Sequence, residues 1–223
     1  MFFIIDHAAK VVVGWSPKCG CTHVKHLLRF FMTGRTDHEN LHHVLPCLLP
    51  TDLRAYAVVI VARNPFDRLV SGFLDKYKKG EALRARFPTI TFAQLVECVV
   101  QRRFDIIDYD HFAPQTEAQF DPRVFQAKSC KIFDLNSIDY EYLEHLFGKR
   151  LPLSVLQYKG GHTRQAYTEE WKTPVYNLNI DTYIHYKVNP GLFYSPALRA
   201  KVYAFFKRDF DLLSARRTFR MFL

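Results

Sequence analysis

The stretch that decides the fold is Val11-Val12-Val13-Gly14-Trp15-Ser16-Pro17-Lys18-Cys19-Gly20-Cys21-Thr22-His23-Val24-Lys25-His26-Leu27-Leu28. Its β-branched, apolar first part predicts a strand, and apolar residues at helical spacing from Val24 onwards predict a helix. Between them lies a tight loop that contains one lysine. The sequence therefore predicts a strand, an anion-binding loop and a helix in succession.

The loop suits a phosphate or a sulfate. The first N–H groups of a helix have no intrahelical acceptor, and the helix dipole adds partial positive charge there. Gly20 lets the backbone approach an anion closely, Lys18 adds a full charge, and Thr22 either caps the helix or offers its hydroxyl to the anion. This is not a Walker A loop, in which the lysine directly precedes the helix. An ordinary strand-to-helix turn with a solvated lysine is the alternative that this stretch alone leaves open.

A second strand, turn and helix is expected at residues 56–77. Residues 56–62 are a continuous apolar run, typical of a central strand buried on both faces. The turn that follows contains two arginines and a serine, and Asp67 is the expected helix cap. Because ligands bind at the carboxyl ends of parallel strands, the two turns are expected at one edge of the sheet. Together they predict a ligand with two separated anionic groups.

The remaining pattern completes an α/β fold. Strands are expected at residues 2–5, 10–15 and 132–135, and helices at 20–34, 91–103, 137–147 and 195–213. Gly34 and Gly148 are expected to end two of these helices, and Ser137 to begin one. Residues 106–119 lack periodicity and are expected to form a loop over a site. The predicted fold is one α/β domain, residues 1–223, with a central parallel sheet flanked by helices.

The composition indicates a globular protein with a basic surface. The net charge is +9, from 31 Lys and Arg against 22 Asp and Glu, which attracts anionic ligands. No dense basic run, zinc-finger or RNP1-type pattern points to nucleic acid. Five cysteines without framework spacing exclude a complete disulfide set and favour a reducing compartment. No signal peptide is recognisable and no apolar run reaches the roughly 18 residues that span a bilayer, so a soluble, cytoplasmic protein is expected.

The two turns resemble motifs of the sulfotransferase superfamily, in particular family 2 enzymes of the chondroitin/HNK-1 carbohydrate sulfotransferase kind. Pro17-Lys18-Cys19-Gly20-Cys21-Thr22 resembles the 5′-phosphosulfate loop. Arg63-Asn64-Pro65-Phe66-Asp67-Arg68-Leu69-Val70-Ser71 resembles the 3′-phosphate motif R-[DN]-P-[FW]-x-R-L-x-S. Further similar segments are Asp110-His111-Phe112-Ala113-Pro114-Gln115, Lys131-Ile132-Phe133-Asp134 and Tyr194-Ser195-Pro196-Ala197-Leu198-Arg199.

The resemblance implies a sulfotransferase whose donor is 3′-phosphoadenosine 5′-phosphosulfate (PAPS), whose product is adenosine 3′,5′-bisphosphate, and which needs no metal. In-line transfer would place Lys18 where charge builds on the departing 5′-phosphate oxygen. Arg68 is either a phosphate ligand or a structural residue. The residues implied in donor binding are Pro17, Lys18, Cys19, Gly20, Cys21, Thr22, His23, Arg63 and Ser71.

A histidine base is expected to take the proton of the acceptor hydroxyl. In related glycan O-sulfotransferases it lies before the 3′-phosphate strand, where this chain has His42 and His43, and the sequence does not choose between them. Glu39 is the carboxylate alternative, and His111 is expected to contact the acceptor. The acceptor implied is a hydroxyl group on a carbohydrate. The membrane anchor, stem and paired lumenal cysteines of Golgi members are not found, which favours a cytosolic enzyme.

Two other functions stay open. A nucleotide kinase would share the strand, loop and helix, but this chain has no Walker A pattern and no evident pair of metal-binding carboxylates. A non-catalytic protein could bind an acidic glycan or nucleic acid on its basic surface. Such a protein would show salt-dependent binding without affinity for adenosine bisphosphate.

Overall fold

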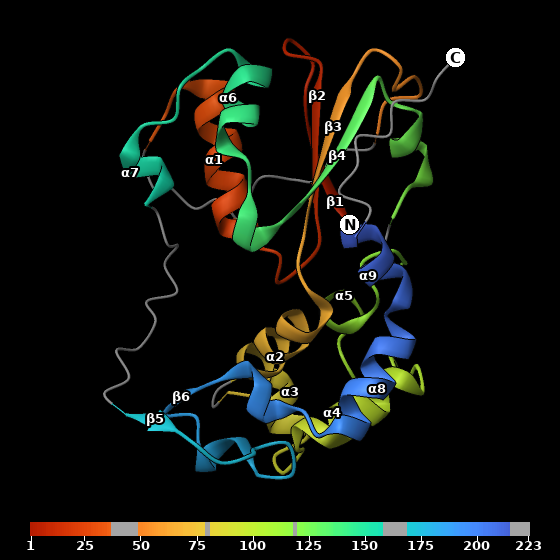
Figure 1. Cartoon of the computed structure of the whole chain (residues 1–223), viewed down its shortest axis with the longest axis vertical. Coiled ribbons are helices and arrows are strands. Elements are labelled where there is room, and N and C mark those ends of the chain that lie inside the picture. The colour runs from red at the N-terminus through yellow and green to blue at the C-terminus, as the bar shows by residue number, and fades with distance from the viewer. Residues whose placement is uncertain (37–48, 79–80, 118–119, 158–168, 215–223) are drawn as a thin grey trace. The chain divides into compact units, whose positions relative to one another are not determined.

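The computed structural model describes residues 1–36, 49–78, 81–117, 120–157 and 169–214, which fall into two compact units (Figure 1). Unit 1 comprises Met1–Arg63, Gln115–Thr163 and Leu212–Leu223. Unit 2 comprises Asn64–Pro114 and Arg164–Asp211. The boundary after residue 63 divides the second expected motif, so that Arg63 belongs to unit 1 and the rest of the motif to unit 2.

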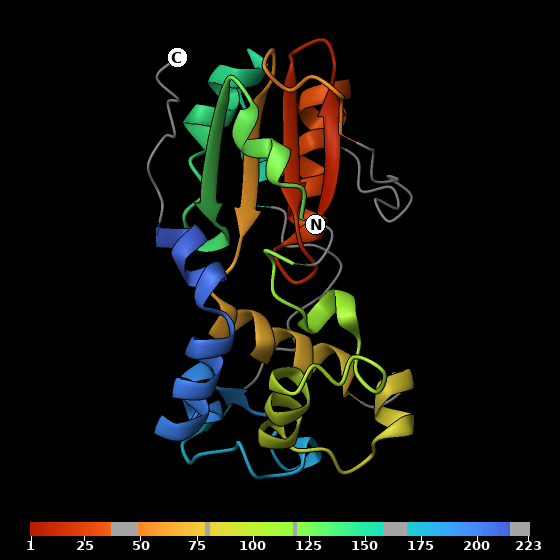
Figure 2. The same cartoon turned by 90° about the vertical axis from the view of Figure 1, so that its right-hand side faces the viewer.

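Unit 1 is built on a four-stranded sheet in the order β1-β2-β3-β4 (Figure 2). β2 pairs in parallel with β3, and β3 with β4, whereas β1 is antiparallel to β2. The expected α/β fold is thus confirmed, but the sheet is mixed, because only the short turn at residues 7–10 connects β1 to β2. The strands are β1 (Phe2–Asp6), β2 (Val11–Trp15), β3 (Ala57–Ala62) and β4 (Ser129–Asp134).

Helices cover one face of this sheet. α1 (Cys21–Thr33) and α6 (Tyr140–Phe147) pack there, and both end as expected at a glycine in the left-handed conformation, Gly34 and Gly148. Asp139, not Ser137, caps α6. The expected cap was wrong because residues 135–137 already form a 3₁₀ turn. The other elements of the unit are η2 (Pro122–Gln126), η3 (Leu135–Ser137) and α7 (Leu153–Leu156).

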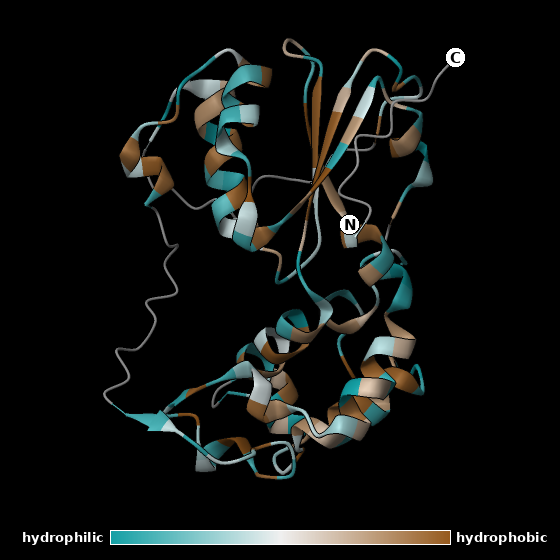
Figure 3. Cartoon of the chain, viewed as in Figure 1, coloured by the Kyte–Doolittle hydropathy of each residue, from teal (hydrophilic) through white to brown (hydrophobic). Residues whose placement is uncertain are grey.

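The central strands are apolar on both faces, as the continuous apolar runs predicted. Val13 and Val59 pack beneath α1, whereas Val12 and Val58 belong to a second core on the opposite face. Successive side chains of a strand point to opposite faces, so a strand covered on both sides must be apolar throughout. Figure 3 shows β2 and β3 as the most continuously hydrophobic segments of unit 1.

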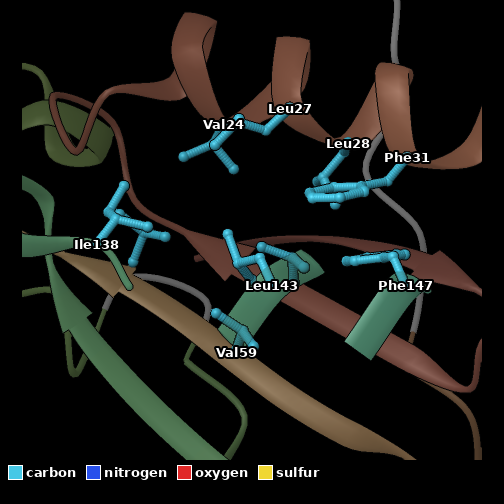
Figure 4. A pocket seen from close by; sticks show the side chains of 10 residues that line it. Val24, Leu27, Leu28, Phe31, Val59, Ile138, Leu143 and Phe147 are labelled. Atoms are coloured by element: carbon cyan, nitrogen blue, oxygen red, sulfur yellow. The ribbon is translucent and has the colours of Figure 1, made fainter. Parts of the chain in front are cut away.

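A small cavity remains in the core between α1, α6 and the sheet (Figure 4). Its lining is aliphatic or aromatic, with no group that could bind an anion. The cavity is therefore a packing gap rather than a donor site. The residues that line it are Val13, Val24, Leu27, Leu28, Phe31, Val59, Val61, Ile138, Leu143 and Phe147.

Unit 2 is mostly helical around an aromatic core. Phe73, Phe92, Phe112, Phe193 and Tyr183 are fully buried within it. Its elements are α2 (Pro65–Lys76), α3 (Ala82–Arg86), α4 (Phe92–Val100), α5 (Tyr109–Phe112), β5 (Glu170–Trp171), η4 (Ile180–Thr182), β6 (Lys187–Val188), η5 (Pro190–Phe193), α8 (Pro196–Phe205) and the part of α9 (Lys207–Ser214) up to Asp211.

Three expectations for unit 2 need correction. Asn64, not Asp67, caps α2, because Pro65 already occupies the first helical position and places Asp67 inside the first turn. The expected loop at residues 106–119 contains the single helical turn α5, which Asp108 caps. The expected helix at residues 195–213 begins at the cap Ser195 but is interrupted at Phe206, whose side chain is buried.

Candidate active site

The loop after β2 is a tight turn that gives Lys18 an uncommon backbone conformation. Cys19 N–H donates to Ser16 O at 3.1 Å. Pro17 occupies the second position of this turn and Lys18, with a φ of 67°, the third, which is the pattern of a type II turn. Glycine is usual at the third position, because a Cβ costs about 1 kcal/mol there. Lys18 is one of three non-glycine residues with a positive φ among the described residues, the others being Lys10 and Arg102.

Gly20 is required at the end of the loop. It is the N-cap of α1, with a φ of 71°. A Cβ built on it would lie 2.4 Å from Leu135 Cδ1, so a larger residue would have to displace that side chain as well as adopt the strained positive φ. Glycine therefore lets the loop turn into α1 while η3 packs directly against it.

The first turn of α1 is left open to an anion. No side chain caps the helix and its first turn contains no acidic residue. An α-helix leaves the N–H groups of its first three residues, here Cys21, Thr22 and His23, without intrahelical acceptors. Thr22 lies inside this turn, so of its two expected roles capping is wrong and contact with the anion stays a prediction.

The His23 side chain points toward α6. Its Nε2 lies 3.0 Å from the Tyr140 hydroxyl, and the two rings meet edge to face. Burial raises the pKa of Tyr140, so this hydroxyl keeps its proton at neutral pH. His23 can therefore face an anion with its backbone N–H while its ring is held by Tyr140.

The second motif begins beside this loop. β2 and β3 are neighbours in register, with Trp15 opposite Val61, so the residues that follow the two strands are adjacent. Arg63 Nη1 donates to Lys18 O at 3.1 Å. Unit 1 therefore brings together Lys18 and Arg63, the principal cationic residues of the two motifs.

Gln115 connects the same two loops. Its Oε1 accepts from Arg63 N–H at 3.0 Å and from Cys19 Sγ at 2.9 Å, and its Nε2 donates to Arg63 O at 2.8 Å. The residue is only 1% exposed. The sequence prediction missed this role. Gln115 was recognised only as the last residue of a family-like segment.

In unit 2, Arg68 has the structural role that was one of its two expected alternatives. Its guanidinium is buried and donates to Ala113 O at 2.7 Å and to Asp110 O at 3.0 Å. These bonds connect α2 to the segment around α5. Ser71 lies half-buried on α2, one turn after Arg68.

His111 is paired with a carboxylate. Its Nδ1 lies 2.9 Å from Asp108 Oδ2, and its N–H donates to Asp108 Oδ1 at 3.1 Å. Burial acts to raise the pKa of Asp108, but the hydrogen bond and charge of His111 outweigh it and hold that pKa below its usual value. The carboxylate lies close to Nδ1 and favours a ring orientation in which Nε2 points elsewhere.

The residues predicted to bind the donor or the acceptor divide between the units. Residues 17–23 and Arg63 belong to unit 1, whereas Ser71 and His111 belong to unit 2. The expected bases His42 and His43, and the alternative Glu39, lie outside the described residues. In the part of the chain that the structure describes, no helix is long and apolar enough to cross a membrane.

Comparison with known proteins identifies the family. Searches of curated proteins and of solved structures gave no match. A match to the sulfotransferase family, family 2 of the superfamily, extends over residues 2–214 and confirms the resemblance seen in the two motifs. The chain belongs to the sulfotransferase family.

Proposed function

We propose that this chain transfers the sulfuryl group of PAPS to a hydroxyl group on a carbohydrate. Membership of the family supports sulfotransfer in general. The observation that supports this donor is the hydrogen bond of 3.1 Å from Arg63 Nη1 to Lys18 O. It brings together two basic loops, and PAPS has two separated anionic groups to match them.

The 5′-phosphosulfate is proposed to lie at the start of α1. The N–H groups of Cys21, Thr22 and His23 would bind its oxygens, and Pro17, Cys19 and Gly20 would shape the loop around them. Lys18 would neutralise the charge that develops on the 5′-phosphate oxygen as its bond to sulfur breaks. Removing one such group from an active site typically costs about 100- to 1,000-fold in turnover.

The 3′-phosphate is proposed to bind Arg63 and Ser71. The planar guanidinium of Arg63 offers two parallel donors to a phosphate, which a lysine could not reproduce. The Ser71 hydroxyl would add a third donor. Arg68 is not included, because its guanidinium already donates to two backbone carbonyls.

A histidine is proposed to take the acceptor proton as the new O–S bond forms. We retain His42 and His43 as the candidates for this base, and His111 as the contact to the acceptor. The pairing of His111 with Asp108 supports a fixed ring with Nε2 available to a hydroxyl. For the same reason, His111 stays the alternative candidate for the base.

The test is calorimetric titration of adenosine 3′,5′-bisphosphate into the protein, with Lys18→Ala and Arg63→Ala variants. We expect micromolar binding that both variants weaken by about 10-fold or more, as for the loss of charge-assisted hydrogen bonds. No binding to the intact protein would overturn the proposal. It would favour a non-catalytic protein that binds acidic glycans, and strict dependence of turnover on Mg²⁺ would favour a kinase.

The base is tested by turnover with labelled PAPS and carbohydrate acceptors. We expect the double variant His42→Ala, His43→Ala to lose about 100- to 10,000-fold in turnover with donor affinity near normal. His111→Ala should mainly raise the KM for the acceptor. The reverse pattern would make His111 the base. A single domain and a cytoplasmic location stay predictions.

A further inference from the structure

We propose that Gln115 is a positioning residue that fixes the position of Arg63 relative to the phosphosulfate loop. This inference rests on the proposed function, because the two loops that Gln115 connects are those proposed to bind the two anionic groups of PAPS. Gln115 itself would not touch the donor. It would act through Arg63 and Cys19.

The amide of Gln115 pairs with Arg63 as a neighbouring strand would. β3 and β4 pair up to Ala62, which lies opposite Asp134, and Arg63 is the next residue. Gln115 Oε1 accepts the Arg63 N–H at 3.0 Å, and Nε2 donates to the Arg63 carbonyl at 2.8 Å. The side chain therefore continues the pairing by one residue beyond the strand and fixes the backbone of Arg63.

The same oxygen also holds the other loop. Cys19, between Lys18 and Gly20, is fully buried, and its Sγ donates to Gln115 Oε1 at 2.9 Å. Arg63 Nη1 in turn donates to Lys18 O. Four hydrogen bonds that involve side chains thus link Arg63, Gln115 and the loop into one network.

The chemistry of this network requires an amide. Arg63 offers one donor and one acceptor to the side chain of residue 115, and the planar amide of Asn or Gln presents a matching acceptor atom and donor atom side by side. An ionised glutamate would place a second acceptor against the Arg63 carbonyl. A protonated glutamate would again present a donor, and burial favours that protonated form.

The first experiment measures the network without ligand. Amide hydrogen exchange of Arg63 is compared in the unmodified protein, in Gln115→Met, which keeps the length but has no amide, and in Gln101→Met as a control at an exposed position of unit 2. We expect the Arg63 amide to exchange about 10-fold or more faster in Gln115→Met and unchanged in the control. Unchanged exchange in Gln115→Met would overturn the inference whether or not the protein binds nucleotides.

The second experiment tests whether the network acts through Arg63. In the unmodified background, Gln115→Met is expected to weaken binding of adenosine 3′,5′-bisphosphate by about 10-fold. In the Arg63→Ala background, the same change should weaken binding by less than about 3-fold, because the effects of substitutions at contacting residues are not additive. Equal losses in both backgrounds would mean that Gln115 does not work through Arg63. If the unmodified protein does not bind this nucleotide, the proposed function fails, while the exchange result still decides whether Gln115 holds Arg63.

Gln115→Glu provides a rescue. The nucleotide affinity of Gln115→Glu and the protection of its Arg63 amide against hydrogen exchange are each compared with the unmodified protein at the same pH. Both should recover as the pH is lowered from about 8.5 to about 6.5, because a protonated glutamate again donates to the Arg63 carbonyl. Gln115→Met should show no such recovery. Parallel pH profiles for the two variants would contradict the proposal.

Discussion

α1 and α2 each follow a parallel strand of the sheet, but their first turns have opposite chemistry. α1 has no side-chain cap and no acidic residue in its first turn, and its N-cap is Gly20. α2 begins at Pro65, which has no N–H, the Asn64 side chain accepts the N–H of Phe66, and Asp67 places a negative charge in the first turn. The start of α1 therefore suits an anion, whereas the start of α2 is already capped by Asn64 and its partial positive charge is offset by Asp67.

This difference means that the two turns cannot bind an anion in the same way. The first turn of α1 has neither a side-chain cap nor an acidic residue, whereas Asn64 and Asp67 stabilise the first turn of α2. In the proposed donor site, the second motif would therefore bind its anion through side chains, those of Arg63 and Ser71. The helix end would hold the group that reacts, and the side chains the group that is only recognised.

Among changes at the two helix ends, the largest effect should come from Lys18→Gly. Turnover with PAPS should fall by about 100- to 1,000-fold, because the cation at the departing oxygen is lost. Stability to urea should nevertheless rise by about 1 kcal/mol, because glycine accepts the left-handed conformation without strain.

Lys10→Gly is the matched control. Lys10 also has a positive φ, 56°, but lies in the turn between β1 and β2. Its variant should keep nucleotide affinity, with a smaller gain in stability because the Lys10 contact with the Tyr56 ring is lost. If Lys18→Gly kept its turnover, the strained lysine would have no catalytic role.

Thr22→Asp tests the open end of α1 directly. A carboxylate in this first turn should compete with the ligand and lower affinity for adenosine 3′,5′-bisphosphate by about 10- to 100-fold, since like charges at close range cost roughly 1 to 4 kcal/mol. Thr22→Asn, its neutral counterpart, should lose much less. Asp67→Asn removes a negative charge from the first turn of α2. We expect the affinity of this variant for adenosine 3′,5′-bisphosphate to stay within about 3-fold of that of the unmodified protein. A gain of 10-fold or more would show that the α2 end also binds the anion.

Asn64→Ala tests the capped end of α2. Loss of the cap should lower the free energy of unfolding by about 1 kcal/mol, measured by urea denaturation. Affinity for adenosine 5′-phosphate, which has no 3′-phosphate, should not change, because the start of α1 is unaltered. A loss of this affinity without a loss of stability would contradict the division of roles between the two helix ends.

Local rules predicted most of the framework. The apolar runs gave β2 and β3, glycines ended α1 and α6 where expected, and Ser195 caps α8. Each of these features depends on neighbours in sequence. The caps of α2 and α6 were assigned to the wrong residues, because the competing Asn64 and Asp139 stand only a few positions away and the choice depends on where the first turn begins.

The site was predicted only in part, for a different reason. Lys18 and Arg63 were found because each belongs to a recognisable motif. Gln115 was missed because its partner Arg63 is 52 residues away in sequence, and a single glutamine has no periodicity. The predicted bases His42 and His43 stay predictions. α5 was missed because a single turn is too short to show a helical pattern.

The smallest effect is expected from a substitution at Asp108, the residue that caps α5. Asp108 caps α5 with Oδ1 and contacts His111 Nδ1 with Oδ2. Asp108→Asn keeps an oxygen for the cap but removes the negative charge. The difference between this variant and the unmodified protein therefore measures the ion pair with His111 alone. At about pH 5 the variant should be less stable than the parent by about 0.5 kcal/mol, the scale of a partly exposed ion pair.

The sign of the pH dependence follows from the pKa of Asp108. Burial acts to raise that pKa, but His111 holds it below its usual value, and a carboxyl group in an unfolded chain titrates near pH 3.9. A depressed pKa stabilises the fold above that unfolded value, and the contribution is lost as the pH falls through the folded pKa. Urea denaturation of parent and variant should therefore differ at about pH 5 and converge toward about pH 2.5. A constant difference across this range would mean that Asp108 acts only as a cap, leaving His111 without a charged partner to orient it.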